Sequence, residues 1–218
     1  MTDPGLVAPR VTPVTLEGRW VRLEPLGRQH AGALVRAASG DRSTFGYTRV
    51  PTDEAGMLVY IERALENQRM GQSLPLATFD ATTGLCVGAT RFINIECWEW
   101  PAGHPGRERG GAPDAVEIGS TWLGARAQRT AVNSEAKLLM LGHAFETWGV
   151  RRVRLRTDAR NARSRAAIER LGARLDGILR AHEAGADGAV RDSAMYSMLA
   201  AEWPEARERL ESRLLTRV

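Results

Sequence analysis

The sequence predicts an α/β fold in which a mixed sheet carries helices on both faces. Some segments alternate apolar and polar residues, as strands do, and others repeat apolar residues at helical spacing. These strands follow one another both directly and through helices, so the sheet should contain antiparallel hairpins as well as a parallel crossover. At 218 residues, the chain has the size of one domain.

Local signals set the limits of these elements. The interruption at Glu17 and Gly18 predicts a bent strand or a small hairpin, Thr52 or Asp53 can cap the second helix, and Gly172 can end the fourth. In chain order, we expect a strand region over 14–26, helices over 29–38 and 53–69, a hairpin of strands over 74–80 and 85–95, a strand over 115–123, a helix over 134–148, a strand over 152–157, a helix over 162–171, strands over 175–182 and 190–199, and a helix over 202–215.

Residues 97–114 are rich in proline, glycine and charge, which predicts a long exposed loop. Its Trp98 and Trp100 could rim a binding pocket or pack back on the fold, and the sequence leaves both open. We divide the chain into a flexible tail over 1–13, one domain over 14–201, and a C-terminal amphipathic helix within 202–218 that packs on it.

The composition narrows the classes of function. With 43% hydrophobic and 26% charged residues the chain is not a disordered one, and it shows no apolar run or leader pattern, so we expect a cytoplasmic protein without a membrane partner. Cys86 and Cys97 lack metal-ligand spacing, and we expect no metal. Residues 151–180 hold ten arginines, which suits a phosphate ligand, but no aromatic residue there could stack on bases, so we expect no nucleic acid partner.

The strand, loop and helix over 116–148 resemble an anion-binding cradle. The free N–H groups and the dipole at a helix N-terminus favour phosphate, and the preceding loop adds donors from Gln128, Arg129, Thr130 and Asn133.

This region, VEIGSTWLGARAQRTAVNSEAK, together with RTDARNARSRAAIERLGAR, resembles the core of the GNAT acetyltransferase superfamily, and most of all its RimJ/RimL-like branch. The resemblance covers 115–200 most clearly and reaches back to residue 14 by the order of elements. It implies a mostly antiparallel twisted sheet flanked by helices, with splayed fourth and fifth strands that hold the pantetheine arm of acetyl-CoA.

The resemblance also implies roles for single residues. Asn161 would bind the pantetheine arm or the amine, and Ser164 would help to protonate the leaving thiolate. We take Glu117, which stands beside the cleft, as the candidate base acting through water. The expected contacts of acetyl-CoA are Trp122, Leu123, Gln128, Arg129, Thr130, Ala131, Val132, Asn133, Ser134, Asn161 and Arg165.

Three positions depart from the pattern of the superfamily. Ala131 and Asn133 stand where the loop has glycine or a small residue, so a Cβ could obstruct the cofactor or strain a positive φ. Ile168 stands where many members have a tyrosine that acts as general acid, which leaves Ser164, a water or Tyr196 for that role.

We therefore predict an acetyl-CoA-dependent N-acetyltransferase in which a primary amine attacks the thioester directly in a ternary complex. The acceptor is a protein N-terminus or a small amine. The alternative is a catalytically degenerate CoA or acyl-CoA-binding sensor or scaffold. The sequence leaves a homodimer open, and it explains Glu135 as an acid that stabilises the dipole of its helix.

Overall fold

The computed structural model describes residues 11–216, so most of the expected N-terminal tail and the last two residues lie outside the described chain. The described part contains the strands β1 (Leu16–Glu17), β2 (Val21–Pro25), β3 (Ser73–Asp80), β4 (Cys86–Glu96), β5 (Ala115–Leu123), β6 (Arg152–Asp158), β7 (Arg174–Ala184) and β8 (Val190–Leu199). Its α-helices are α1 (Ala31–Ala38), α2 (Glu54–Arg69), α3 (Ala131–Gly142), α4 (Ala162–Arg170) and α5 (Trp203–Leu215).

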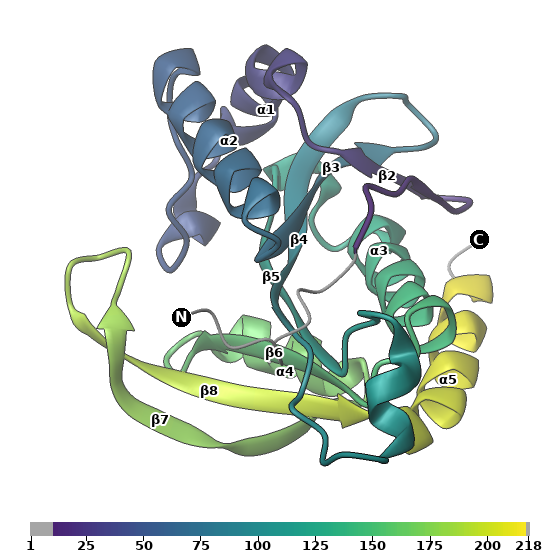
Figure 1. Ribbon diagram of the computed structural model, residues 1–218. Coiled ribbons are helices and arrows are strands. Elements are labelled where there is room, and N and C mark those ends of the chain that lie inside the picture. The colour runs from purple at the N-terminus through teal and green to yellow at the C-terminus, as the bar shows by residue number, and fades with distance from the viewer. Residues whose placement is uncertain (1–10, 217–218) are drawn as a thin grey trace.

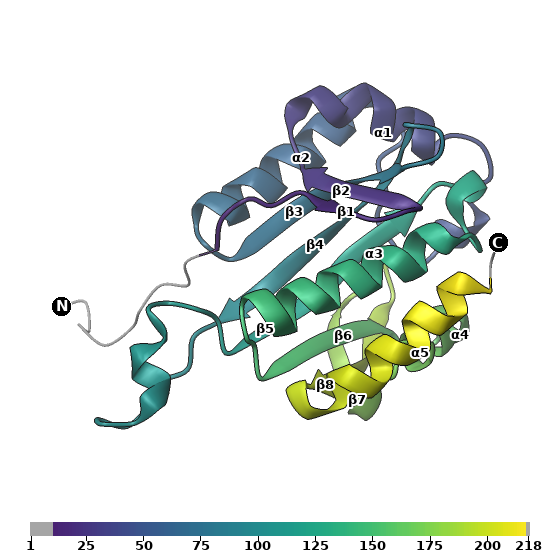
Figure 2. The same cartoon turned by 90° about the vertical axis from the view of Figure 1, so that its right-hand side faces the viewer.

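These strands form one sheet in the order β1-β2-β3-β4-β5-β6-β8-β7 (Figure 1). Within the described residues, β5 and β6 are the parallel pair, and all other neighbours run antiparallel. Helices α1 and α2 cover one face, while α3 and α5 lie on the other (Figure 2). The predicted fold class is thus confirmed. In residues 11–216, no helix has the length and apolar character that a membrane crossing needs.

The core has two parts, one on each face of the sheet. Met140 of α3 and Phe92 of β4 belong to the larger part, and Met57 of α2 belongs to the smaller. Strand β5 contributes to both, because Ile118 faces the first cluster and Trp122 the second. Strand β5 is therefore packed on both faces of the sheet.

Strands β5 and β6 separate after a short stretch of pairing. They are in register only from Ala115 opposite Arg152 to Glu117 opposite Arg154, whereas the other edge of β6 pairs with β8 from Arg152 to Asp158. On its other side, β5 shifts its register against β4, and Ser120 has a φ of 49°. This bulge re-aims the end of β5 and leaves a gap between the two strands.

Helix α3 begins at Ala131, three residues before the expected start, because Thr130 is its N-cap. The Thr130 Oγ1 accepts a hydrogen bond from the N–H of Val132 at 3.3 Å. A π-helical turn, His143–Thr147, then carries the chain toward β6.

Glu135 does more than stabilise the helix dipole, as the sequence suggested. It lies in the second turn of α3, and its buried carboxylate accepts the backbone N–H groups of Arg19 (2.9 Å), Trp20 (2.6 Å) and Val21 (2.8 Å). A Cβ at Gly18 would lie 2.5 Å from this carboxyl group, so any larger residue there would displace the carboxylate. The carboxylate therefore fixes the turn between β1 and β2 against α3.

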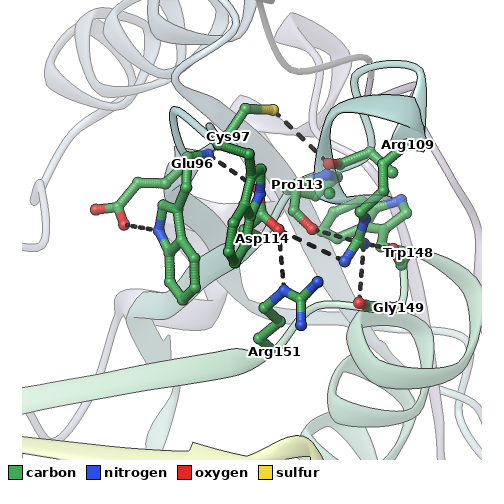
Figure 3. A network of polar contacts seen from close by, with 12 residues as sticks. Glu96, Cys97, Arg109, Pro113, Asp114, Trp148, Gly149 and Arg151 are labelled. Atoms are coloured by element: carbon green, nitrogen blue, oxygen red, sulfur yellow. Dashed lines mark hydrogen bonds and ion pairs between the residues drawn. The ribbon is translucent and has the colours of Figure 1, made fainter. Parts of the chain in front are cut away.

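The loop over 97–114 is anchored by the buried carboxylate of Asp114 (Figure 3). It accepts the backbone N–H of Trp98 at 2.9 Å and the Nε1–H of Trp100 at 3.3 Å, and it pairs with Arg151 at 3.3 Å. The Trp100 ring also stacks on His104, with ring centroids 4.2 Å apart. Trp100 thus packs back on the loop, whereas the Trp98 side chain is 38% exposed, and both lie at the opposite end of β5 from the gap.

Candidate functional site

A cavity of about 630 Å³ occupies the gap between β5 and β6. It reaches both faces of the sheet, since Ile118 and Lys137 line it on the α3 side while Tyr60 and Trp122 line it on the α2 side. The predicted site residues that line it are Glu117, Trp122, Leu123, Gln128, Arg129, Thr130, Asn133, Ser134, Asn161 and Ser164. Ala131, Val132 and Arg165 belong to the same elements but are outside this lining.

The N-terminus of α3 opens into one end of the cavity. The first N–H groups of a helix have no partner within the helix, and the first turn of α3 contains no acidic residue to neutralise them. The positive φ in this loop belongs to Arg129 (64°), whereas Ala131 and Asn133 lie within α3. The strain that we expected at these two residues is therefore absent.

Gln128 connects three walls of the cavity. Its amide nitrogen donates to the Thr44 hydroxyl and to the Leu123 carbonyl, both at 2.8 Å. Its oxygen accepts a hydrogen bond from Arg163 of α4 at 3.2 Å. Since protein groups occupy both ends of this amide, Gln128 shapes the cavity and holds Arg163 at its edge.

Asn161 and Ser164 lie at the start of α4. The Asn161 side-chain oxygen caps the helix by accepting a hydrogen bond from the backbone N–H of Ser164 at 3.0 Å. The Ser164 hydroxyl takes no part in this bond. Ile168 lies further along the helix and also lines the cavity.

The other candidate from this helix, Arg165, is engaged elsewhere. It donates to the Tyr196 hydroxyl at 3.1 Å, and that hydroxyl in turn donates to Glu169 at 2.9 Å. Tyr196 is fully buried, its burial raises the pKa of the phenol, and it is not part of the cavity lining. This geometry does not favour Tyr196 as the acid that we considered.

Glu117 is a buried carboxylate in the wall of the cavity. Its two oxygens accept hydrogen bonds from Arg156 and from Asn94, each at 2.8 Å, which fixes the side chain. A second buried carboxylate, Asp158, ends β6, and the hydrogen bonds from Arg160 hold its pKa below the ordinary value. Each of these carboxylates is thus paired with an arginine, and Arg129 and Arg163 add positive charge to the lining near α3.

Several lining residues were missed by the sequence analysis, among them Tyr47, Tyr60 and Lys137. Tyr47 and Tyr60 come from the segments around α1 and α2, and no local pattern predicts that these segments reach β5. Lys137 is the single lysine among 30 basic residues, which was a visible signal, and it is buried on the cavity side of α3.

Comparisons with known proteins agree with this architecture. The family model described as an acetyltransferase (GNAT) domain matches residues 21–174. The chain belongs to the GNAT acetyltransferase family. Acetyl transfer is therefore its class of chemistry, and the GNAT resemblance seen in the sequence is confirmed. Among curated proteins, none matches the sequence of this acetyltransferase.

Solved structures extend the match over nearly the whole acetyltransferase. A GCN5-related N-acetyltransferase from Brucella melitensis is 29% identical, covers 94% of this chain and 87% of its own, and has a TM-score of 0.79. Mycobacterium smegmatis RimJ in complex with CoA-disulfide is 22% identical over 94% of both chains, with a TM-score of 0.73. The microcin C7 self-immunity acetyltransferase MccE, in complex with acetyl-CoA and AMP, is 20% identical over 84% of this chain and 93% of its own, with a TM-score of 0.66. The similarity to RimJ and MccE shows that this chain shares their fold.

Proposed function

We propose that the protein is an acetyl-CoA-dependent N-acetyltransferase that moves an acetyl group to a primary amine. The observation that carries this proposal is the cavity between β5 and β6, which joins the N-terminus of α3 on one face of the sheet to acidic and aromatic groups on the other. A donor that is anionic at one end and reactive at the other fits such a passage.

The residues at the α3 end suit the phosphates of acetyl-CoA. The N–H groups at the start of the helix that have no partner within it, which include that of Asn133, are donors for phosphate oxygens. Arg129 and Arg163 line the same end and add positive charge. The pantetheine arm would lie along Trp122 and Leu123 of β5. When bound, acetyl-CoA supplies an activated acetyl thioester.

The amine enters from the α2 side, where Glu117 and Tyr60 line the cavity. An amine must be uncharged to attack, and Glu117 is placed to accept its proton through water. Direct attack in a ternary complex is favoured because neither cysteine lines the cavity. Burial raises the pKa of Cys86 to about 11 and also raises that of Cys97, so neither is a ready nucleophile.

The acceptor is a protein N-terminus or a small amine. Incubation of the protein with acetyl-CoA and a panel of both kinds of amine, followed by mass spectrometry and a thiol assay, tests the proposal. We expect an acetylated amine and an equal amount of released CoA. Acetyl-CoA that is bound but left intact across the panel would instead support the alternative, a CoA-binding sensor or scaffold, which Ile168 motivates because it occupies the position of a general acid.

Replacing Ser164 with alanine should lower kcat by about 10- to 100-fold, because it removes a hydroxyl that can hydrogen-bond the leaving sulfur. The Kd for acetyl-CoA should stay within about twofold, since the backbone cap from Asn161 remains. Steady-state kinetics and calorimetry measure both quantities, and an unchanged kcat would remove Ser164 from the mechanism.

Replacing Ala131 with glycine should leave the Kd for acetyl-CoA within about twofold, because Ala131 already has a helical backbone and lies outside the cavity lining. The free energy of unfolding should fall by up to about 1 kcal/mol, the cost of glycine in a helix. A Kd lowered tenfold or more would show that the methyl group obstructs the cofactor after all.

A further inference from the structure

Lys137 is a buried basic residue with no role in the site as described so far. Its Nζ donates to the hydroxyls of Thr121 on β5 at 2.7 Å and of Thr90 on β4 at 3.1 Å, and these two hydroxyls are 2.8 Å apart. The side chain is 5% exposed and also lines the cavity. An ammonium group has three N–H donors, so one remains beyond the two threonines.

Among residues 11–216, no carboxylate forms an ion pair with the Lys137 amine. The groups that face it from β4 and β5 are the hydroxyls of Thr90 and Thr121, and no ion pair joins it to a carboxylate among residues 11–216. On α3 itself, the carboxylate of Glu135 is bound to the backbone at the start of β2. Burial is the cause that lowers the pKa of Lys137 to about 7.

Other charged groups line the same cavity and form no ion pair with Lys137. Glu117 on β5 is already paired with Arg156 of β6. The remaining ones are Asp158 of β6, which is held by Arg160, Glu183 of β7, Arg191 of β8, Arg163 and Arg170 of α4, Arg213 of α5 and Arg129 before α3. Because none of these groups forms an ion pair with Lys137, no carboxylate contact holds its amine in the charged form at neutral pH.

We propose that Lys137 is a charge partner of acyl-CoA, taking up a proton when the anionic cofactor binds and donating its remaining N–H to it inside the cavity. The inference rests on the proposed function, which brings the cofactor to the N-terminus of α3. Two opposing effects act on the amine when it arrives. Further loss of water favours the neutral form, and the negative charge of the phosphates favours the ammonium form.

Geometry decides between these effects. Lys137 is already dehydrated in the free protein, so a ligand can remove little more water from it. The amine lies on the helix whose first turn would hold the phosphates, and the interior between them screens charge less than water does. The attraction therefore exceeds the added desolvation, and the pKa of Lys137 rises when acyl-CoA binds. The sign follows directly: above neutral pH, binding consumes a proton.

The composition of the chain makes this testable on the wild-type protein. The full sequence contains one lysine, Lys137. Labelling the protein with 13C,15N-lysine therefore gives a single lysine side-chain NMR signal. Its titration midpoint should lie near neutral pH in the free protein and rise by at least about one unit with saturating CoA. A midpoint that stays in place or falls would overturn the inference, while the proposed function would stand if acetyl-CoA binds.

Calorimetry of CoA binding in two buffers of different ionisation enthalpy provides a second readout. At about pH 8, where a phosphate is fully ionised, a rise of the Lys137 pKa by one unit corresponds to an uptake of about 0.4 proton per CoA by the wild type, and a larger rise to more. Lys137→Met should take up almost none and bind at least about twofold more weakly. Lys137→Met should not lower the melting temperature, because methionine fills the space without a buried amine. Equal proton uptake in both proteins would contradict the inference, and a wild type that fails to bind CoA would overturn the proposed function with it.

Discussion

Replacing Glu135 with alanine is expected to lower the free energy of unfolding by about 3 to 5 kcal/mol. The substitution removes one carboxylate but strands three backbone N–H groups, those of Arg19, Trp20 and Val21, at the start of β2. Hydrogen bonds to an ionised acceptor are stronger than neutral ones, and the Val21 group lies in the buried core. Urea unfolding followed by circular dichroism measures the change.

Glutamine at the same position provides the matched control. Glu135→Gln keeps one oxygen as an acceptor and nearly the same shape, so it should lose about half as much stability as alanine. If Glu135→Ala changed the unfolding free energy by less than about 1 kcal/mol, the carboxylate would not be holding the turn between β1 and β2.

Replacing Glu117 with glutamine should reduce kcat/KM by about 100-fold, because the amide cannot accept the proton of the attacking amine. The Kd for acetyl-CoA should change little, since Glu117 lies on the wall away from the N-terminus of α3. The fold should survive, because Arg156 keeps a second carboxylate, Glu183, at 3.7 Å. Steady-state kinetics with the best amine from the acceptor panel gives the comparison.

The Glu183→Gln variant is the control that distinguishes loss of the proposed base from the general effect of removing a negative charge. Like Glu117, it lines the cavity and pairs with Arg156, but it belongs to β7 and is half-exposed. Glu183→Gln should leave kcat/KM within about twofold. Wild-type activity in Glu117→Gln would reduce Glu117 to a structural partner of Arg156 and Asn94.

Local sequence patterns were sufficient for the order of elements and for the fold. Alternation identified the strands, and the turn residues ATTG identified the hairpin of β3 and β4. The start of α3 was misplaced because residues 131–133 were assigned to the preceding polar loop, whereas Thr130 caps the helix and they form its first turn. The bulge at Ser120 has no sequence signal, since serine is not a residue that prefers a positive φ.

The site was predictable where one continuous segment forms it. Residues 117 to 134 and the start of α4 supply much of the cavity lining, and the family resemblance covers both. Tyr60 could not be placed, because its contact with Trp122, 3.3 Å between the hydroxyl and Nε1, joins residues 62 positions apart. The burial of Glu135 and Lys137 was also hidden, because their partners are on distant strands and helix periodicity assigns polar residues to the surface.

The central claim is that the passage between β5 and β6 binds acetyl-CoA. Calorimetric titration of the purified protein with acetyl-CoA, and separately with desulfo-CoA, tests it most directly. We expect one site per chain with micromolar affinity for acetyl-CoA and similar affinity for the analogue, because the phosphates supply most of the contacts. No detectable heat of binding up to millimolar concentration would contradict the assignment of the cofactor and, with it, the proposed function.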